Sequence, residues 1–221
     1  MKIAALILTI LFSILCIIEL YFCFKQNNKM RKIFKTFCVF SLSIVIILLM
    51  PNHPLLYSAL LFGAFGDLLL IYKKDYLFYL GALSFLTGHA LFYSEIFVEI
   101  LSSFIPTYFY IIFFISLMII SLILYKPFTF ITKKKLPLLS GCFYFSILIG
   151  ALILMITSVC YMPTSFMYFG ILGYVLFITS DFILCFAKFN HDFKYRQFIV
   201  MLTYLLAELF ISLGFYLTLG I

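Results

Sequence analysis

The sequence predicts an all-α membrane protein, a single domain over residues 1–221 built as one bundle of eight transmembrane helices. Hydrophobic residues make up 66% of the chain and charged residues 10%, whereas soluble proteins are about half apolar and one quarter charged. The apolar residues form runs close to the roughly 20 residues that a helix needs to cross the hydrocarbon layer. The Lys and Arg residues lie between these runs. A chain organised in this way has no room for a soluble domain.

Hydropathy indicates the spans, and prolines and clusters of charge indicate their boundaries. The first apolar run begins as a secretory signal peptide would, but it continues to Phe24 without a small-x-small cleavage site, so we interpret it as the first span. The second span is short for a crossing, and a start at Ile33 or a small tilt would accommodate it. The eight predicted spans cover residues 3–24, 36–50, 55–72, 76–98, 107–125, 136–158, 164–187 and 196–219.

The boundaries of the later spans follow the same signals. The third span follows Pro54, and the lysine pair 73–74 separates it from the fourth. The basic segment 126–135 separates the fifth span from the sixth. The seventh span follows Pro163, and the eighth begins at Arg196. Each of these residues is one that a transmembrane helix excludes or places at its end.

The basic residues alternate along the chain. Of the 15 Lys and Arg residues, 14 fall at the connections after the first, third, fifth and seventh spans, and only Lys2 falls on the other side. Cytoplasmic loops collect Lys and Arg, so we predict that both termini lie on the non-cytoplasmic side. The net charge of +7 is then a topology signal, and no nucleic-acid partner is expected. The compact, cation-biased chain suits a bacterial inner membrane.

Five ionisable residues lie well inside the predicted spans, away from their ends: Glu19, Asp67, His89, Asp181 and Glu208. A charged group at membrane depth costs about 2.5–3.5 kcal/mol on insertion scales, so it needs either a partner or a function. At a rise of about 1.5 Å per residue, Asp67 and Asp181 both lie roughly 8 to 9 Å inside the cytoplasmic boundary. Glu19 lies at a similar depth, whereas His89 and Glu208 lie nearer to mid-membrane. Together these groups could line one pocket open to the cytoplasmic leaflet.

Helical spacing adds aromatic residues to this set, because residues four apart share a face of a helix. Phe85, His89 and Tyr93 form one such stripe, and Tyr204 and Glu208 form another. Packing is the better general explanation of Phe and Tyr stripes in a membrane bundle. These two stripes are of interest because each carries an ionisable residue.

A structural interpretation competes with the functional one for each residue. A lone polar residue in a span often only joins helices, and for Glu19, Tyr93 or Glu208 taken singly the two interpretations are about equal. The matched depth of Asp67 and Asp181 favours function instead.

Two further features accompany these acids. Gly63 and Gly66 beside Asp67 would let a neighbouring helix, or a substrate, approach closely. Glu95 lies near an outer end of its span, where we expect it to reach water.

Several intramembrane chemistries lack their residues. A retinal protein needs a lysine within a span, a serine hydrolase of the common type needs a G-x-S-x-G motif, and a zinc hydrolase needs several intramembrane histidines, of which only His89 qualifies. An aspartyl protease needs Gly where Ala64 stands, and its two aspartates occur in the reverse order. The six cysteines have no metal-ligand spacing. We therefore expect no disulfide, no metal and no other cofactor.

Four short stretches resemble the YhhN-like membrane proteins, whose characterised members are lysoplasmalogenases. The stretches are 61–70 (LFGAFGDLLL), Phe85 with His89 and a nearby Tyr, 173–181 (GYVLFITSD) and 204–208 (YLLAE), with the basic run 31–35 before the second span. They occur in the right order and in register with eight spans, so the resemblance covers most of the chain. The chain departs from the family at Thr36, where Pro often follows Lys, and at Phe92-Tyr93, since the family's Tyr commonly falls three residues after the His.

The resemblance implies hydrolysis of the vinyl ether bond of a lysoplasmalogen, a 1-alkenyl-glycerophosphoethanolamine or -choline, to a fatty aldehyde and a glycerophospho-base. Vinyl ethers hydrolyse by protonation of the carbon β to oxygen, which creates an oxocarbenium ion that water captures. Such catalysis needs one protonated carboxylic acid and one carboxylate, the division of labour that glycosidases use. We expect Asp67, Asp181 and His89 to be catalytic, and either aspartate could be the acid. The reaction requires no cofactor.

The expected substrate-binding residues are Tyr93, Tyr204, Glu208, Glu19 and Lys35. Tyr204 and Glu208 would hydrogen-bond the glycerol or the second carboxylate, and the apolar tail would lie among the Phe-rich helices. Lys35, with Lys73 and Lys74, stands near the cytoplasmic rim where a phosphate head group would rest, although topology alone is the better explanation of these lysines.

A small transporter or proton-coupled carrier is the alternative function, because intramembrane acids also mark ion pathways. Short loops and the absence of a visible repeat or broken helices count modestly against it. A purely structural membrane protein does not explain two aspartates at matched depth. The sequence leaves open the head group, the chain length and the oligomeric state.

Overall fold

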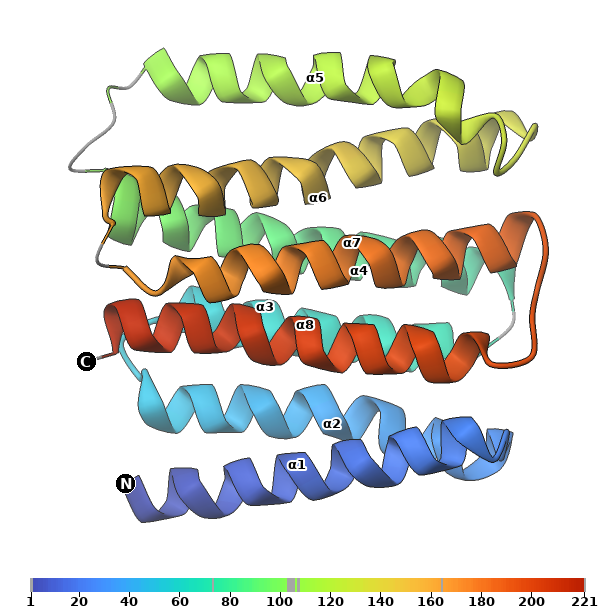
Figure 1. Cartoon of the computed structure of the whole chain (residues 1–221), viewed down its shortest axis with the longest axis horizontal. Helices are drawn as coiled ribbons and strands as arrows, with labels where there is room; N and C mark the ends of the chain where they lie inside the picture. The colour runs from blue at the N-terminus through green and yellow to red at the C-terminus, as the bar shows by residue number, and fades with distance from the viewer. Residues whose placement is uncertain (1, 73, 103–105, 107, 164, 221) are drawn as a thin grey trace.

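The computed structural model describes residues 2–72, 74–102, 106, 108–163 and 165–220, without the side chains of residues 2–5 and 28. Eight α-helices form a single bundle in which each helix runs antiparallel to the next along the chain, and a π-helix continues the fourth (Figure 1). The described residues contain no strand. The elements are α1 (Lys2–Phe24), α2 (Asn28–Leu49), α3 (Pro54–Leu70), α4 (Asp75–Glu95), η1 (Ile96–Leu101), α5 (Tyr108–Phe128), α6 (Lys135–Tyr161), α7 (Met167–Phe189) and α8 (Arg196–Leu219).

The two ends of the bundle differ in charge. The connections α1–α2, α3–α4, α5–α6 and α7–α8 lie at the right of Figure 1 and hold the clustered Lys and Arg residues. We call this end the cationic end. Both termini and the remaining connections lie at the opposite end, which we call the terminal end (Figure 1). The basic connections, which the sequence predicted to lie on one side, therefore do lie together at one end of the bundle.

Seven of the eight α-helices are long and apolar enough to cross a membrane, and α3, with 17 residues, is shorter. The predicted order of eight helical segments is confirmed, and the chain is an integral membrane protein by the length and composition of these helices. The hairpins α1–α2, α3–α4 and α7–α8 pack most extensively. Helices α1 and α5 form the outer edges of the bundle, with exposed apolar side chains that suit contact with lipid (Figure 1).

The predicted start of the second span, residue 36, is wrong by two turns. Helix α2 begins at Asn28, because the side chain of Asn27 accepts a hydrogen bond of 3.2 Å from the backbone N–H of Met30 and caps the helix. Its basic first turns therefore continue directly into the apolar part. This removes the difficulty of the short second span, and it fixes Arg31 and Lys35 on a rigid helix.

The π-helix η1 carries α4 past the predicted end of the fourth span at residue 98. Its buried residues Ile96, Ile100 and Leu101 hold this end of α4 inside the bundle. Glu95 is consequently only 2% exposed, and its carboxylate lies 2.5 Å from Nδ1 of His53. The expectation that Glu95 reaches water is wrong, because the helix does not end where hydropathy falls.

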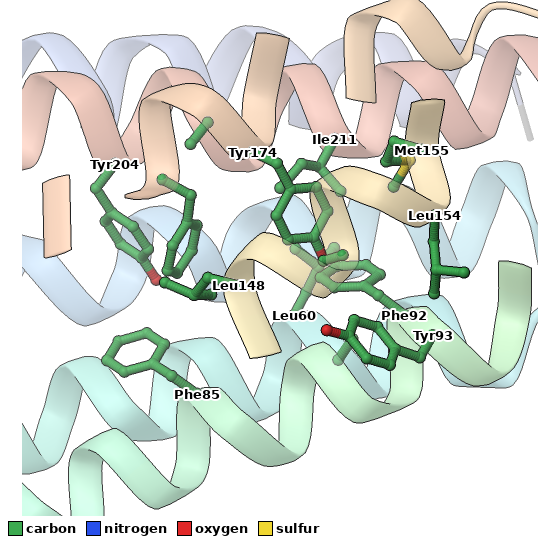
Figure 2. Close-up of a cluster of buried hydrophobic side chains, with 14 of the residues drawn as sticks. Leu60, Phe85, Phe92, Tyr93, Leu148, Leu154, Met155, Tyr174, Tyr204 and Ile211 are labelled. Carbon is green, nitrogen blue, oxygen red and sulfur yellow. The ribbon is translucent and has the colours of Figure 1, made fainter. Parts of the chain in front are cut away.

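The centre of the bundle is aromatic. Figure 2 shows Tyr174 from α7, Tyr204 from α8 and Phe85 and Tyr93 from α4 within one buried cluster. Helices α7 and α8 approach so closely that a Cβ added at Gly173 would lie 2.9 Å from the backbone nitrogen of Ile211. Only glycine permits this approach, which is typical of membrane helix pairs. The tight pairing of α7 with α8 fixes the register between the acids that these two helices carry.

Candidate functional site

Three helices bury carboxyl groups in one region. Asp67 on α3, Asp181 on α7 and Glu208 on α8 are 1%, 7% and 3% exposed. Asp67 acts electrostatically on both of the other carboxyls, and Asp181 acts on Glu208. The structure therefore brings together the two aspartates of the predicted pair, and adds the predicted glutamate to them. We call these three residues the acid cluster.

Asp67 is paired with a cation. The Nζ atom of Lys35 on α2 lies 3.0 Å from Oδ1 of Asp67, and both side chains are buried. A buried carboxylate is stable only with such a partner. The second oxygen, Oδ2, has no hydrogen-bond partner among the described residues. Asp67 is thus a charge-compensated carboxylate whose second oxygen interacts with Tyr204 without a hydrogen bond of full geometry.

Asp181 has a different environment. The hydroxyl of Tyr144 on α6 donates a hydrogen bond to Oδ2 of Asp181. The neighbouring Ser180 donates to the backbone carbonyl of Val200 at 3.0 Å, which ties this turn of α7 to α8. No cation is paired with Asp181 among the described residues. The two aspartates therefore lie near one another but hold unlike partners.

Tyr204 and Glu208 occupy the space that Gly63 leaves open. A Cβ added at Gly63, one turn before Asp67 on α3, would lie 3.4 Å from Oε1 of Glu208 and 3.5 Å from the Tyr204 hydroxyl. That hydroxyl lies close enough to Asp67 and Glu208 to interact with both, but neither it nor Glu208 Oε2 makes a hydrogen bond of full geometry among the described residues. Buried polar atoms are nearly always paired with protein or water. Unpaired polar atoms meeting Asp67 in one place favour a site that takes water or a polar ligand group.

Gly66 has the role expected of a small residue beside Asp67. A Cβ added there would lie 2.9 Å from the ring of Phe85 on α4, so glycine lets this ring approach α3 closely. The Phe85 ring also packs edge-on against Tyr204, at 5.9 Å between centroids (Figure 2). An aromatic wall therefore encloses the acid cluster on its α4 side.

His89 lies in this aromatic wall and contacts neither aspartate through a hydrogen bond in the described part of the chain. Its Nδ1 atom lies 3.2 Å from the Tyr174 hydroxyl, and its ring packs edge-on against Phe177 at 4.6 Å between centroids. Its Nε2 atom is buried and has no partner among the described residues. The catalytic role predicted for His89 stays a prediction, since a bound ligand or water would be needed to connect it to the acids.

Two other predicted residues lie further from the acid cluster. The Tyr93 hydroxyl donates to the backbone carbonyl of Ile147 on α6, a bond that joins two helices. Glu19 on α1 is fully buried, accepts a hydrogen bond of 3.3 Å from the Cys23 thiol, and interacts electrostatically with Lys35. Tyr93 therefore has the bonding of a structural residue, whereas Glu19 extends the cluster through Lys35.

An apolar groove leads to Asp181. It has a volume of about 340 Å³ and lies between α4, α6 and α7, with Tyr144 and Asp181 among its lining residues and otherwise mainly aliphatic and aromatic side chains. Leu83 and Phe143 in its wall are 57% and 49% exposed, so the groove reaches the outer surface of the bundle. Such a groove suits the hydrocarbon chain of a lipid.

A second cavity, of about 520 Å³, opens at the cationic end between α2, α3, α7 and α8. It shares Leu70, Phe78 and Leu184 with the apolar groove, and it includes Lys35. Lys74, expected near the head group, does not line it and lies over the ring of Tyr76 instead. Lys73 lies outside the described residues.

The described residues contain one group that could hold a metal ion, and it lies away from the acid cluster. His53, Glu95 and Glu99 at the terminal end offer ligand atoms within 4.8 Å of one another. The described residues of the acid cluster do not form such a group, and the Lys35 cation beside Asp67 would repel a metal ion. The chemistry that the acid cluster supports is acid–base chemistry next to an apolar groove.

Tyr144 is the functional candidate that sequence reasoning missed. It lies on α6, where the sequence has no ionisable neighbour within the span to draw attention to it. Tyr174, the partner of His89, belongs to the stretch 173–181, but the sequence did not predict a role for it. A tyrosine buried at the depth of Asp181 was the available signal, but aromatic residues are too frequent in this chain for that signal to be distinctive.

The comparison with known families gives one result. The sequence profile of the YhhN family matches residues 30–215, a segment that includes Lys35, Asp67, His89, Asp181 and Glu208. No curated protein and no solved structure matches the chain.

Proposed function

The chain belongs to the YhhN family, and from this premise we propose that it is a membrane-embedded hydrolase that cleaves the vinyl ether bond of lysoplasmalogens. The products are a fatty aldehyde and a glycerophospho-base. The observation that carries the proposal is the meeting of two buried aspartates with unlike partners beside a groove of lipid-tail character. Acid–base cleavage of an ether needs one carboxyl that carries a proton and one that does not.

The partners of the aspartates support an assignment of roles. Lys35 compensates the negative charge of Asp67, so Asp67 is the carboxylate that stabilises the oxocarbenium ion and accepts a proton from water. Asp181 has no cation beside it in the described part of the chain and lines the groove, so it is the acid. The Tyr144 hydroxyl on Oδ2 leaves Oδ1 of Asp181 to carry the transferable proton.

The reaction then proceeds in three steps. Asp181 gives its proton to the carbon β to the ether oxygen, and the π electrons of the double bond form the new C–H bond. Water adds to the resulting oxocarbenium carbon while Asp67 takes a proton from that water. The hemiacetal collapses as its hydroxyl proton moves to the glycerol oxygen, the C–O bond breaks, and the proton on Asp67 returns to Asp181.

The remaining polar atoms of the cluster have a role in this scheme. The Tyr204 hydroxyl and Glu208 Oε2, neither of which makes a hydrogen bond of full geometry among the described residues, would hydrogen-bond the attacking water or a glycerol hydroxyl. His89 would act on the same water through its unpaired Nε2. Glu19 and Lys35 set the charge balance around Asp67.

The test compares lipids that differ in one bond. Purified protein in detergent is mixed with a 1-alkenyl lysophospholipid or with its 1-acyl counterpart, and the fatty aldehyde is measured by mass spectrometry. We expect aldehyde from the alkenyl lipid, and none from the Asp67→Asn or Asp181→Asn variants, provided that each variant gives the same thermal unfolding curve as the unmodified chain. Unchanged aldehyde release by both variants would refute the proposal.

The same preparations test the competing function. In liposomes, solute or proton flux that depends on Asp67 and Asp181, without aldehyde formation, would favour a carrier instead. For the orientation we propose that the cationic end faces the cytoplasm of a bacterial inner membrane, since cytoplasmic loops collect Lys and Arg.

A further inference from the structure

Among the described residues, five cations and one acid line the cavity at the cationic end, which we call the basic cleft. The cations are Arg31, Lys32, Lys35, Lys188 and Arg196, and the acid is Asp192. Three helices supply the cations, since the first three belong to α2, Lys188 to α7 and Arg196 to α8. A concave surface that gathers charge of one sign from three helices attracts and holds anions.

The ion pairs in the basic cleft do not prevent its cations from binding an anion. Lys35 is paired with Asp67, Lys188 with Asp75 at 2.7 Å and Arg196 with Asp192 at 3.1 Å. Asp75 and Asp192 are largely exposed, and exposed pairs contribute about 0–1 kcal/mol, so a bound anion can replace them.

Arg31 is the strongest single indication of an anion. Its Nε atom is buried and has no hydrogen-bond partner among the described residues. The guanidinium group binds the oxygens of a phosphate through parallel hydrogen bonds. The charge of Arg31 acts on the buried carboxylate of Glu19, but Nε itself has no hydrogen-bond acceptor among the described residues and is available to an anion in the cavity.

Topology accounts for the number of cations at this end but not for their placement in the cleft. Lys133 and Lys126 belong to the same cationic end, yet neither lines any cavity described above. Arg31 and Lys35 lie within α2, whose early start places them on a rigid helix.

The basic cleft and the apolar groove lie next to each other. Both are lined by Leu70, Phe78 and Leu184, and the acid cluster lies beside them, since Asp181 lines the groove and Lys35 lines the cleft. The order of the parts is thus anion site, acid pair and apolar groove. A lysophospholipid has the same order of phosphate, glycerol linkage and hydrocarbon chain.

We propose that the basic cleft binds the phosphodiester of the lysophospholipid head group, with Arg31 and Arg196 as its principal contacts. This proposal rests on the function proposed above and adds the recognition of the phosphate. It also changes the residues expected from the sequence, because Arg31 and Arg196 take the place of Lys73 and Lys74.

Kinetics on two substrates test the proposal. One substrate is a 1-alkenyl-glycerophosphoethanolamine, and the other is a 1-alkenylglycerol, which has the same vinyl ether and no phosphate. We expect Arg31→Gln and Arg196→Gln each to raise KM for the phospholipid about tenfold, as loss of a charge-assisted hydrogen bond does, with kcat little changed. KM for the alkenylglycerol should be unchanged in both variants. Equal changes on both substrates, or no change on either, would overturn the proposal.

Two controls keep the result interpretable. Lys133→Gln removes a cation from the same end of the bundle but not from the cleft, and it should leave both KM values unchanged. Arg31→Lys keeps the charge and loses the planar donor group, so it should fall between Arg31→Gln and the unmodified chain. If Arg31→Gln fails to fold, Arg196→Gln and Arg31→Lys carry the test.

A binding measurement separates failure of this proposal from failure of the hydrolase. The affinity of the unmodified chain for an acyl lysophosphatidylethanolamine and for a monoacylglycerol is measured by thermophoresis, with no reaction required. Tighter binding of the phospholipid, lost in Arg31→Gln, supports the phosphodiester site even if no aldehyde is ever formed. Equal affinity for the two lipids counts against the site. The lysophospholipid affinity is then measured again in the presence of saturating inorganic phosphate. If phosphate binds and the lipid affinity stays unchanged, the cleft is assigned to free phosphate and the proposal is overturned.

Discussion

The protein buries acids in two places, and their bonding differs. At the terminal end, Glu95 is held by His53 at 2.5 Å, and neither carboxylate oxygen of Glu95 is among the buried atoms without a partner. In the acid cluster, Asp67 Oδ2, Glu208 Oε2 and the Tyr204 hydroxyl are buried close to one another, and among the described residues none of them makes a hydrogen bond of full geometry. Proteins seldom leave buried polar atoms unpaired. The comparison indicates that burial of an acid alone does not favour a functional site, whereas several buried polar atoms in one place without complete hydrogen bonds do.

The largest expected effect is a loss of kcat that occurs on substitution in the acid cluster but not at Glu95. Asp181→Asn removes the transferable proton and should lower kcat for aldehyde release by about 10²- to 10⁴-fold, the usual contribution of a general acid. Glu95→Gln should leave kcat unchanged but lower the melting temperature, because it weakens a buried ion pair. Mass spectrometry of the aldehyde and thermal unfolding in detergent measure the two effects. If Glu95→Gln lowered kcat as strongly, the distinction between the two places would be lost.

The next effect concerns the charge balance of Asp67. Lys35→Met leaves this carboxylate buried without its cation, and removal of one partner of a buried pair costs about 3–5 kcal/mol. The double variant Lys35→Met/Asp67→Asn should recover most of this stability, since no uncompensated charge remains, but it should stay inactive. Thermal unfolding of the two variants and the parent measures the effect. A double variant no more stable than Lys35→Met would mean that Lys35 stabilises the bundle by packing and not through Asp67.

A smaller effect distinguishes two tyrosines. Tyr144→Phe removes the hydroxyl that donates to Asp181 and should lower kcat roughly tenfold, as loss of one hydrogen bond to a charged group does. Tyr93→Phe is the matched control, because its hydroxyl donates to the backbone carbonyl of Ile147. This control should keep its kcat with reduced thermal stability. Equal kcat values in the two variants would remove Tyr144 from the site.

The smallest effect concerns two glycines. Ala at Gly63 would place its methyl group in contact with Glu208 and the Tyr204 hydroxyl, and should lower kcat a few-fold with little loss of stability. Ala at Gly173 would meet the backbone of α8 at 2.9 Å, which cannot yield, so it should lower the melting temperature. Steady-state kinetics and thermal unfolding on both variants measure the contrast. Loss of stability in Gly63→Ala as large as in Gly173→Ala would indicate that Gly63 serves helix packing.

The sequence predicted most of the fold and all three residues of the acid cluster. Hydropathy located all eight helices in order, and the matched depth of Asp67 and Asp181 singled out two carboxyls that interact electrostatically in the bundle. The start of α2 was missed, since the cap at Asn27 lies within a polar stretch that hydropathy assigns to a loop. Tyr144 was missed because nothing in α6 itself indicates which of its side chains faces Asp181.

The sequence alone determined the helical segments, the alternation of basic connections and the depth of each acid. These properties depend on residues close together in the chain and on the fixed thickness of a bilayer. Tertiary structure decided the partners: Lys35 for Asp67, Tyr144 for Asp181 and His53 for Glu95, the last two pairs being 37 and 42 residues apart. Each partnership depends on how helices rotate and pack against one another, and in a membrane that is set by side-chain fit between helices rather than by hydropathy. The difference between a paired acid and an unpaired one therefore arises only when the bundle has assembled.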